Sequence, residues 1–128
     1  MNSVTITLPI PPTCLSPNGR AHWAKRSAAT KQQRSDAMYY ALEKIVGPSP
    51  KWDRAVVTIR WFAKDEARIP DIDNAIGSTK GARDGLQDAG IIRNDRGVET
   101  IHVWRVTDRA RPRVELTIQP ITQPTSKE

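Results

Sequence analysis

The sequence predicts a single α/β domain of the α+β kind, with a mixed sheet of about four strands and two main helices. Four short segments are rich in β-branched and aromatic residues, and two longer segments carry helical periodicity. They follow one another in the order β-α-β-α-β-β along 128 residues, a length that fits one domain over residues 1–128. The single Cys14 excludes an internal disulfide, and no Cys/His spacing suggests zinc.

The amino-terminal half is predicted to contain one strand and one helix. Residues Val4–Leu8 alternate apolar and polar side chains, as a half-buried strand does, and a proline-rich loop runs from Pro9 to Gly19. Helical spacing then predicts one apolar stripe, formed by Met38, Ala41, Leu42 and Ile45. The segment Gly47-Pro48-Ser49-Pro50 ends this helix.

The carboxy-terminal half is predicted to contain the second helix and three strands. The helix runs from Asp73 to about Ala89, with Gly90 at the C′ position that favours glycine. A tail that begins at Pro120 is expected to fray. The three strands are Ala55–Ala63, Val98–Thr107 and Arg113–Gln119. If the third strand of the chain lies antiparallel to the second, its start comes close to the second strand's end.

The charge balance favours a polyanionic partner. The net charge is +6 and the isoelectric point is about 9.9, and a cationic protein gains affinity for nucleic acid by releasing counterions from phosphates. The acids gather between Asp65 and Asp95, and basic flanks around an acidic centre suit a nuclease better than a passive binder. The chain shows no secretory signal and no apolar run of about 20 residues, which predicts a cytoplasmic protein without a membrane partner.

The segment from Ser16 to Arg34 is the predicted DNA-binding surface, because it contains five cations and no acid. A solvated helix face is the alternative. A tryptophan here can stack on an unpaired base, although tryptophans more often pack in a core, as we expect for Trp52, Trp61 and Trp104. The predicted DNA-contacting residues of this segment are Arg20, His22, Trp23, Lys25, Arg26, Lys31 and Arg34.

Asp71, Asp73 and Asp95 are the candidate metal ligands. The first two lie at the start of the predicted second helix, where the macrodipole favours anions, and on that helix Asp73, Lys80 and Asp84 fall within about 40° of one another. Clustered carboxylates repel unless they bind a cation, and oxygen ligands select magnesium, manganese or calcium. The alternative is that Asp71 or Asp73 only caps the helix and that Asp95 is an ordinary turn residue. The spacing alone favours neither this alternative nor the metal site.

These residues resemble the signature of the RusA family of Holliday-junction resolvases, which are common in phages and prophages. The signature is the run Pro70-Asp71-Ile72-Asp73-Asn74, then Lys80, Asp84-Gly85-Leu86, Asp88-Ala89-Gly90 and Asn94-Asp95. The opening segment is similar too, with Leu8-Pro9, Pro11-Pro12, Leu15-Ser16-Pro17-Asn18 and His22-Trp23. The resemblance spans Val4 to about Ile118.

The resemblance implies a RusA-like fold and a homodimer. It also implies an endonuclease that works in a bacterial host cell and resolves four-way DNA junctions by paired nicks. It implies Mg²⁺ as the cofactor, with Mn²⁺ as an alternative. Asp71, Asp73 and Asp95 match the family's metal-binding acids, and Lys80 matches its functional lysine.

Three departures from the family pattern stand out. Asn94 occupies a position where the family often has a second acid. Lys80 follows Asp73 by seven positions rather than four, although it still precedes Asp84 by four. Pro70 replaces a basic residue, so that Arg68 becomes the nearest cation and a further predicted DNA contact.

Three other functions remain open from the sequence. The chain can be a DNA-binding module without catalysis, in which the acids are caps and turns. It can be a metal-dependent nuclease that acts on flaps or forks, since branch selectivity depends on surface shape. Asn94 also raises the possibility of a prophage remnant that has lost activity.

Overall fold

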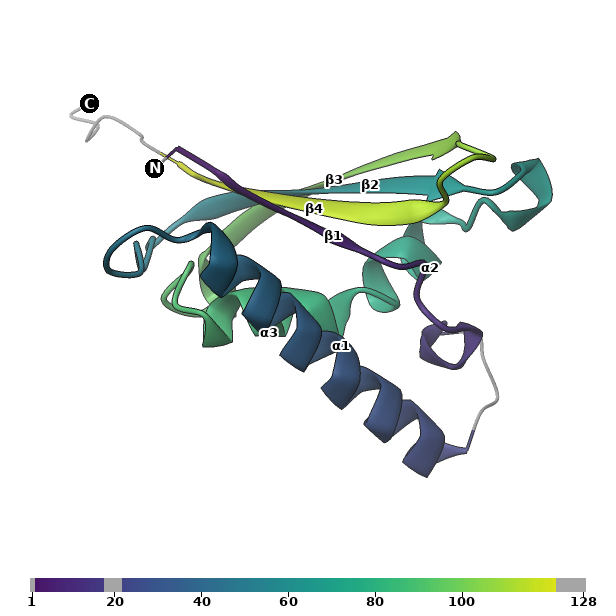
Figure 1. Ribbon diagram of the computed structural model, residues 1–128, viewed down its shortest axis with the longest axis horizontal. Helices are drawn as coiled ribbons and strands as arrows, with labels where there is room; N and C mark the ends of the chain where they lie inside the picture. The colour runs from purple at the N-terminus through teal and green to yellow at the C-terminus, as the bar shows by residue number, and fades with distance from the viewer. Residues whose placement is uncertain (1, 18–21, 122–128) are drawn as a thin grey trace.

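The computed structural model describes residues 2–17 and 22–121 and has two layers, a four-stranded sheet and a layer of helices on one face (Figure 1). This confirms the predicted α+β class and element order. Short 3₁₀ turns are η1 (Thr13–Leu15), η2 (Glu66–Arg68) and η3 (Asp95–Gly97). The main elements are β1 (Val4–Leu8), α1 (Trp23–Lys44), β2 (Ala55–Ala63), α2 (Ile72–Gly77), α3 (Lys80–Asp88), β3 (Val98–Thr107) and β4 (Arg113–Pro120).

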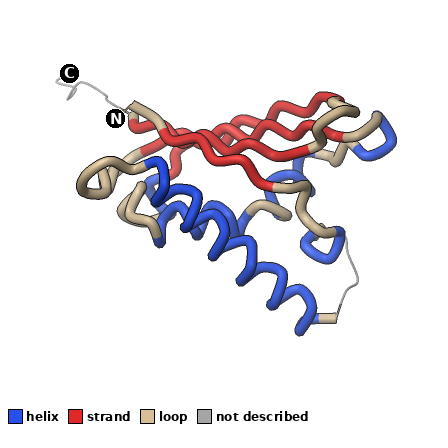
Figure 2. The backbone as a smooth tube through the Cα atoms, in the orientation of Figure 1, coloured by secondary structure: helices blue, strands red, loops and turns tan. Residues whose placement is uncertain are grey.

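The sheet is mixed, with the strand order β1-β4-β2-β3. β4 pairs antiparallel with both β1 and β2, whereas β2 and β3 are parallel. The antiparallel arrangement expected for β2 and β3 is therefore wrong, since Val98 pairs with Ala55 and the two strands start at the same end. Parallel neighbours need a crossover connection, and α2 and α3 provide it beneath the sheet (Figure 2).

The core lies between the sheet and the helices. Alternate residues of the three strands β1, β4 and β2 point into it, among them Ile6, Leu116 and Ile59, each at most 1% exposed. On α1 the fully buried positions are Ala37 and Ala41. The predicted stripe is partly wrong, because Leu42 is 45% exposed while Met38 and Ile45 only pack at the margin of the core.

The second helix is not continuous as predicted, because it breaks at Ser78–Thr79 into α2 and α3. The hydroxyl of Ser78 donates to the Asn74 carbonyl at 2.6 Å, and the buried hydroxyl of Thr79 donates to the Ala75 carbonyl at 2.9 Å. Such side chains compete for backbone acceptors and disturb a helix. Asp73 and Lys80 therefore lie on different helices, and the prediction that they share one helical face is wrong.

Of two other predicted boundaries, the end of the second helix at Gly90 is confirmed and the start of the tail at Pro120 is not. Gly90 ends α3 with a φ of +81°, as its C′ position requires. Pro120 belongs to β4 and pairs with Ala55, and the Ile121 N–H donates to the Arg54 carbonyl at 2.9 Å, so the tail does not begin at Pro120. The rest of the predicted tail, residues 122–128, lies outside the described residues.

The tryptophans divide between core and surface. Trp61 is buried and Trp52 packs against the core, as predicted. Trp104 is 62% exposed, so its predicted packing role is wrong. The sheet topology explains this exposure. β3 is an edge strand, and Trp104 pairs with Arg60, so its side chain lies on the sheet face that the helices do not cover.

We expect Gly85→Ala to destabilise the protein by about 2 kcal/mol. A Cβ at Gly85 would lie 2.4 Å from the Arg34 carbonyl oxygen and 2.8 Å from the Ala37 Cβ, so α1 and α3 would have to separate. Overpacking of up to about 3 kcal/mol outweighs the gain of about 1 kcal/mol in helix propensity. Urea denaturation measures the difference. The control Ala28→Gly, at an exposed position of α1, should lower the free energy of unfolding only by the helix-propensity difference of about 1 kcal/mol.

We expect the ion pair between α1 and α3 to make stability depend on acid pH. The Arg34 guanidinium donates to both Asp88 oxygens, at 2.5 and 2.8 Å, and holds the pKa of Asp88 below its ordinary value. A carboxyl group whose pKa is lower in the folded state than in the unfolded state stabilises the fold at pH values above its unfolded-state pKa. This stabilisation is lost as the pH falls through the folded-state pKa.

Asp88→Asn should therefore lower the free energy of unfolding by only about 0.5 kcal/mol near neutral pH, because both groups are partly exposed. The difference from wild type should shrink as the pH is lowered from about 5 towards 2. Urea denaturation at several pH values measures it. A difference that stays constant over this range would contradict the role of the ion pair.

Candidate active site and DNA-binding surface

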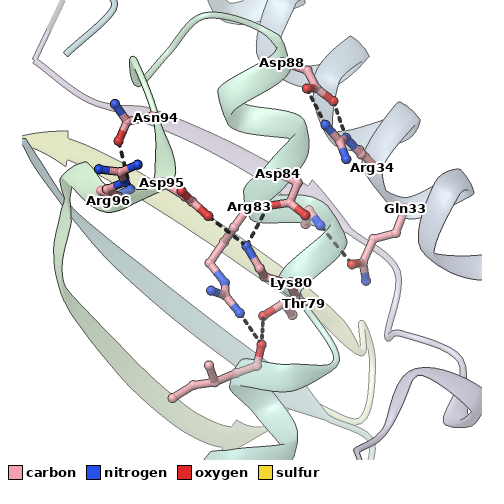
Figure 3. Close-up of polar contacts among 12 residues, drawn as sticks. Gln33, Arg34, Thr79, Lys80, Arg83, Asp84, Asp88, Asn94, Asp95 and Arg96 are labelled. Atoms are coloured by element: carbon pink, nitrogen blue, oxygen red, sulfur yellow. Dashed lines mark hydrogen bonds and ion pairs between the residues drawn. The ribbon is translucent and has the colours of Figure 1, made fainter. Parts of the chain in front are cut away.

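Lys80 is the centre of the candidate active site, because its ammonium bridges two carboxylates (Figure 3). Its Nζ lies 2.7 Å from Oδ1 of Asp84, one turn further along α3, and 3.4 Å from Oδ2 of Asp95 in η3. The structure thus brings together two predicted residues, Lys80 and Asp95. Asp84 is a third member, which the sequence places on the same helical face as Lys80 without indicating a catalytic or metal-binding role.

The local sequence explains how Asp95 is presented. The amide oxygen of Asn94 accepts from the Arg96 N–H at 3.0 Å and caps η3, in which Asp95 is the first residue. Asn94 therefore has a structural role at the position where the family often has an acid. Because β3 starts immediately after η3 and runs parallel to β2, the chain returns beside α3 and places Asp95 next to Lys80.

Asp71 and Asp73 lie on the other element of the crossover, at the start of α2. Oδ1 of Asp71 accepts from the Asn74 N–H at 2.7 Å, so Asp71 caps α2 as the alternative predicted, and its Oδ2 has no hydrogen-bond partner among the described residues. Asp73 is exposed in the first turn. Within residues 2–17 and 22–121, no three His, Cys, Asp or Glu side chains lie close enough together to hold a metal ion.

The start of α2 is held from two sides. Nη1 of Arg105 on β3 donates to the Pro70 carbonyl at 3.1 Å, and Oγ of Ser16 donates to Oδ1 of Asn74 at 2.6 Å. Gly77 allows this loop to come close, since a Cβ there would lie 2.3 Å from Cγ of Pro17. The two aspartates of α2 are therefore positioned by β3 and by the loop after β1.

Two clefts flank these elements. One of about 390 Å³ is lined by Lys80, Arg83 and Asp95 over an apolar floor. Another of about 440 Å³ lies where the loop after β1 meets α2, and its lining includes Trp61, Arg68 and Asn74. Sequence reasoning did not single out Arg83. Burial lowers the pKa of Arg83, while the charges of Asp84 and Asp95 act in the opposite direction.

Three predicted DNA contacts have partners within the protein. Arg34 pairs with Asp88, Arg68 pairs with Asp65, and Nη1 of Arg26 donates to the Ser16 carbonyl at 3.0 Å. Arg34 and Arg26 thereby hold α1 against α3 and against the loop after β1, whereas the Arg68 pair is local to η2.

Four of the other predicted DNA contacts lie in the first half of α1 or next to it. His22 caps α1 by accepting from the Ala24 N–H at 3.1 Å, and Trp23 is 74% exposed rather than in the core. Lys25 and Lys31 are exposed. Arg20 lies outside the described residues. The first turns of α1 project beyond the sheet (Figure 1), which leaves this end of the helix accessible to a partner.

None of the helices described by the structure is long and apolar enough to cross a membrane.

The comparisons with known proteins agree with the resemblance in the sequence. The family model described as Endodeoxyribonuclease RusA matches residues 9–119. The chain is also 36% identical over 127 residues to a protein of Xylella fastidiosa (strain Temecula1) described as an uncharacterized protein, a match that covers 95% of this chain and 80% of that protein. The matched family span contains both crossover helices and Asp95. The chain belongs to the RusA family of endodeoxyribonucleases, metal-dependent enzymes that resolve Holliday junctions.

Proposed function

We propose that this nuclease resolves four-way DNA junctions by paired nicks that depend on Mg²⁺, with Asp71, Asp73 and Asp95 as the metal ligands. The observation that carries the proposal is the ammonium of Lys80 held between Asp84 and Asp95, because it shows that the crossover brings carboxylates of α3 and η3 to one point beside the family's lysine. Carboxylate oxygens are the donors that Mg²⁺ and Mn²⁺ prefer, so the chemistry of the donor set fits.

The proposed ligands come from two parts of the crossover, Asp71 and Asp73 from the start of α2 and Asp95 from η3, which follows α3. Asp71 engages one oxygen in capping α2, and its other oxygen remains for a cation. When bound, the metal supplies an activated water and stabilises charge on the scissile phosphate. Lys80 donates to a phosphate oxygen and stabilises the charge that develops there.

We also propose that two copies of the chain act together as a homodimer. The two cuts in a junction are related by two-fold symmetry, which a symmetric dimer supplies. β3 supports this proposal as an edge strand whose exposed apolar side chains include Trp104, at 62% exposed, and Val106, at 46%. An edge strand with such side chains favours pairing with another chain.

Asp73→Asn should abolish cleavage of a four-way junction while binding of the junction survives, because the substitution removes a ligand charge from an exposed position. Cleavage of junction, flap and linear duplex is measured with Mg²⁺, with Mn²⁺ and with a chelator, and binding is measured in the chelator. Asp53→Asn, an exposed carboxylate paired with Arg93, is the matched control and should cleave normally. Loss of binding together with cleavage would instead indicate that Asp73 is only structural.

Trp104→Ala should shift the protein from dimer to monomer at micromolar concentration, because it removes the largest exposed apolar side chain of β3. Sedimentation equilibrium measures the mass of each variant. Trp23→Ala removes an equally large exposed side chain from α1 and should leave the dimer intact. Identical masses for the wild type and Trp104→Ala would place the interface elsewhere.

A further inference from the structure

Arg83 is a cation that neither the fold nor the proposed metal site accounts for. It lies on α3, between Lys80 and Asp84, and lines the cleft of about 390 Å³ together with Lys80 and Asp95. The floor of this cleft is apolar, built from residues such as Val57, Leu86 and Ile101. Figure 3 shows the guanidinium of Arg83 on the same side of α3 as the Lys80 ammonium.

The hydrogen-bonding capacity of Arg83 is largely unused. A guanidinium has five N–H donors. Its Nη2 donates to the Ile76 carbonyl at 2.5 Å, whereas its buried Nε has no partner among the described residues. The Ile76 carbonyl also accepts from the Thr79 hydroxyl at 3.1 Å, so it does not depend on Arg83 for a donor. A buried N–H donor without an acceptor is unfavourable, and this holds for the Nε of Arg83.

The neighbouring carboxylates are already engaged. Asp84 and Asp95 both pair with Lys80, and Glu99, which also lines the cleft, pairs with Arg54 at 3.2 Å. Within the described residues Arg83 forms no ion pair of its own at 4.0 Å or less. The three carboxylates thus share two cations, Lys80 and Arg54, and Arg83 is the cation lining the cleft that an entering anion meets without an ion pair to break.

We propose that this cleft binds a backbone phosphate of the DNA substrate, with Arg83 donating to the phosphate oxygens and Lys80 beside it. The planar guanidinium suits a phosphate because it donates two parallel hydrogen bonds. The inference rests on the proposed function, because the phosphate belongs to the DNA strand that is cut at the proposed metal site of Asp71, Asp73 and Asp95. It adds a DNA contact within the catalytic cleft, separate from the predicted surface of α1.

The test compares Arg83→Gln, Arg83→Lys and wild type for binding of a four-way junction in chelator, over a series of salt concentrations. Arg83→Gln should weaken binding about tenfold and make the slope of log affinity against log salt shallower by about 1. Arg83→Lys should keep the slope, because the charge remains, but lose part of the affinity. Arg93→Gln removes the same charge outside the cleft lining and should leave affinity and slope near the wild-type values.

Thermal unfolding of each variant separates binding from folding. Unfolding midpoints close to wild type, with the losses above, would support the proposal. Unchanged affinity and slope in folded Arg83→Gln would overturn it. If Arg83→Gln does not fold, folded Arg83→Lys decides, since wild-type affinity there would also overturn the proposal. Because binding is measured without metal, a wild type that binds but does not cleave would reject the proposed function alone.

Discussion

The parallel pairing of β2 with β3 is the constraint on which the candidate site depends. Two parallel neighbours cannot be joined by a hairpin, so the chain must cross back beneath the sheet before β3 begins. α2 and α3 make this crossing, and the return brings η3 alongside α3. Lys80 and Asp95, fifteen positions apart, meet for this reason, at 3.4 Å. In an antiparallel pair the start of β3 would lie at the other end of β2, and Asp95 would lie away from Lys80.

The crossover is held in place by close packing against α1. Gly85 lets the backbone of α1 approach α3, and the alanines at positions 37 and 41 keep the facing side of α1 narrow. Polar contacts fix the register of the two helices, since Gln33 accepts from the Ala82 N–H at 2.9 Å and donates to the Ser78 carbonyl at 2.9 Å. The same glutamine therefore satisfies backbone groups on both sides of the break between α2 and α3.

Hydrophobic periodicity predicts much of this fold, because strands such as Val4–Leu8 and Ala55–Ala63 carry their burial pattern in the local sequence. It does not predict the direction of β3, which depends on pairing over long sequence distances. The break at Ser78–Thr79 was missed because hydroxyl bonds to the preceding turn override helical spacing. In the site, Lys80 and Asp95 were predicted from motif order, whereas Arg83 was not, since its importance appears only in its buried, unpaired Nε.

The arrangement of charge also suggests why cations and carboxylates share one cleft. Lys80 pairs with both Asp84 and Asp95, which reduces the repulsion between these two neighbouring carboxylates. A divalent cation on Asp95 would compete with this ammonium and release it towards solvent. An ammonium freed in this way beside Arg83 would make the cleft a stronger anion site than it is while Lys80 pairs with both carboxylates. Metal and phosphate would then favour each other's binding by linkage, because each one compensates the charge that the other leaves unpaired.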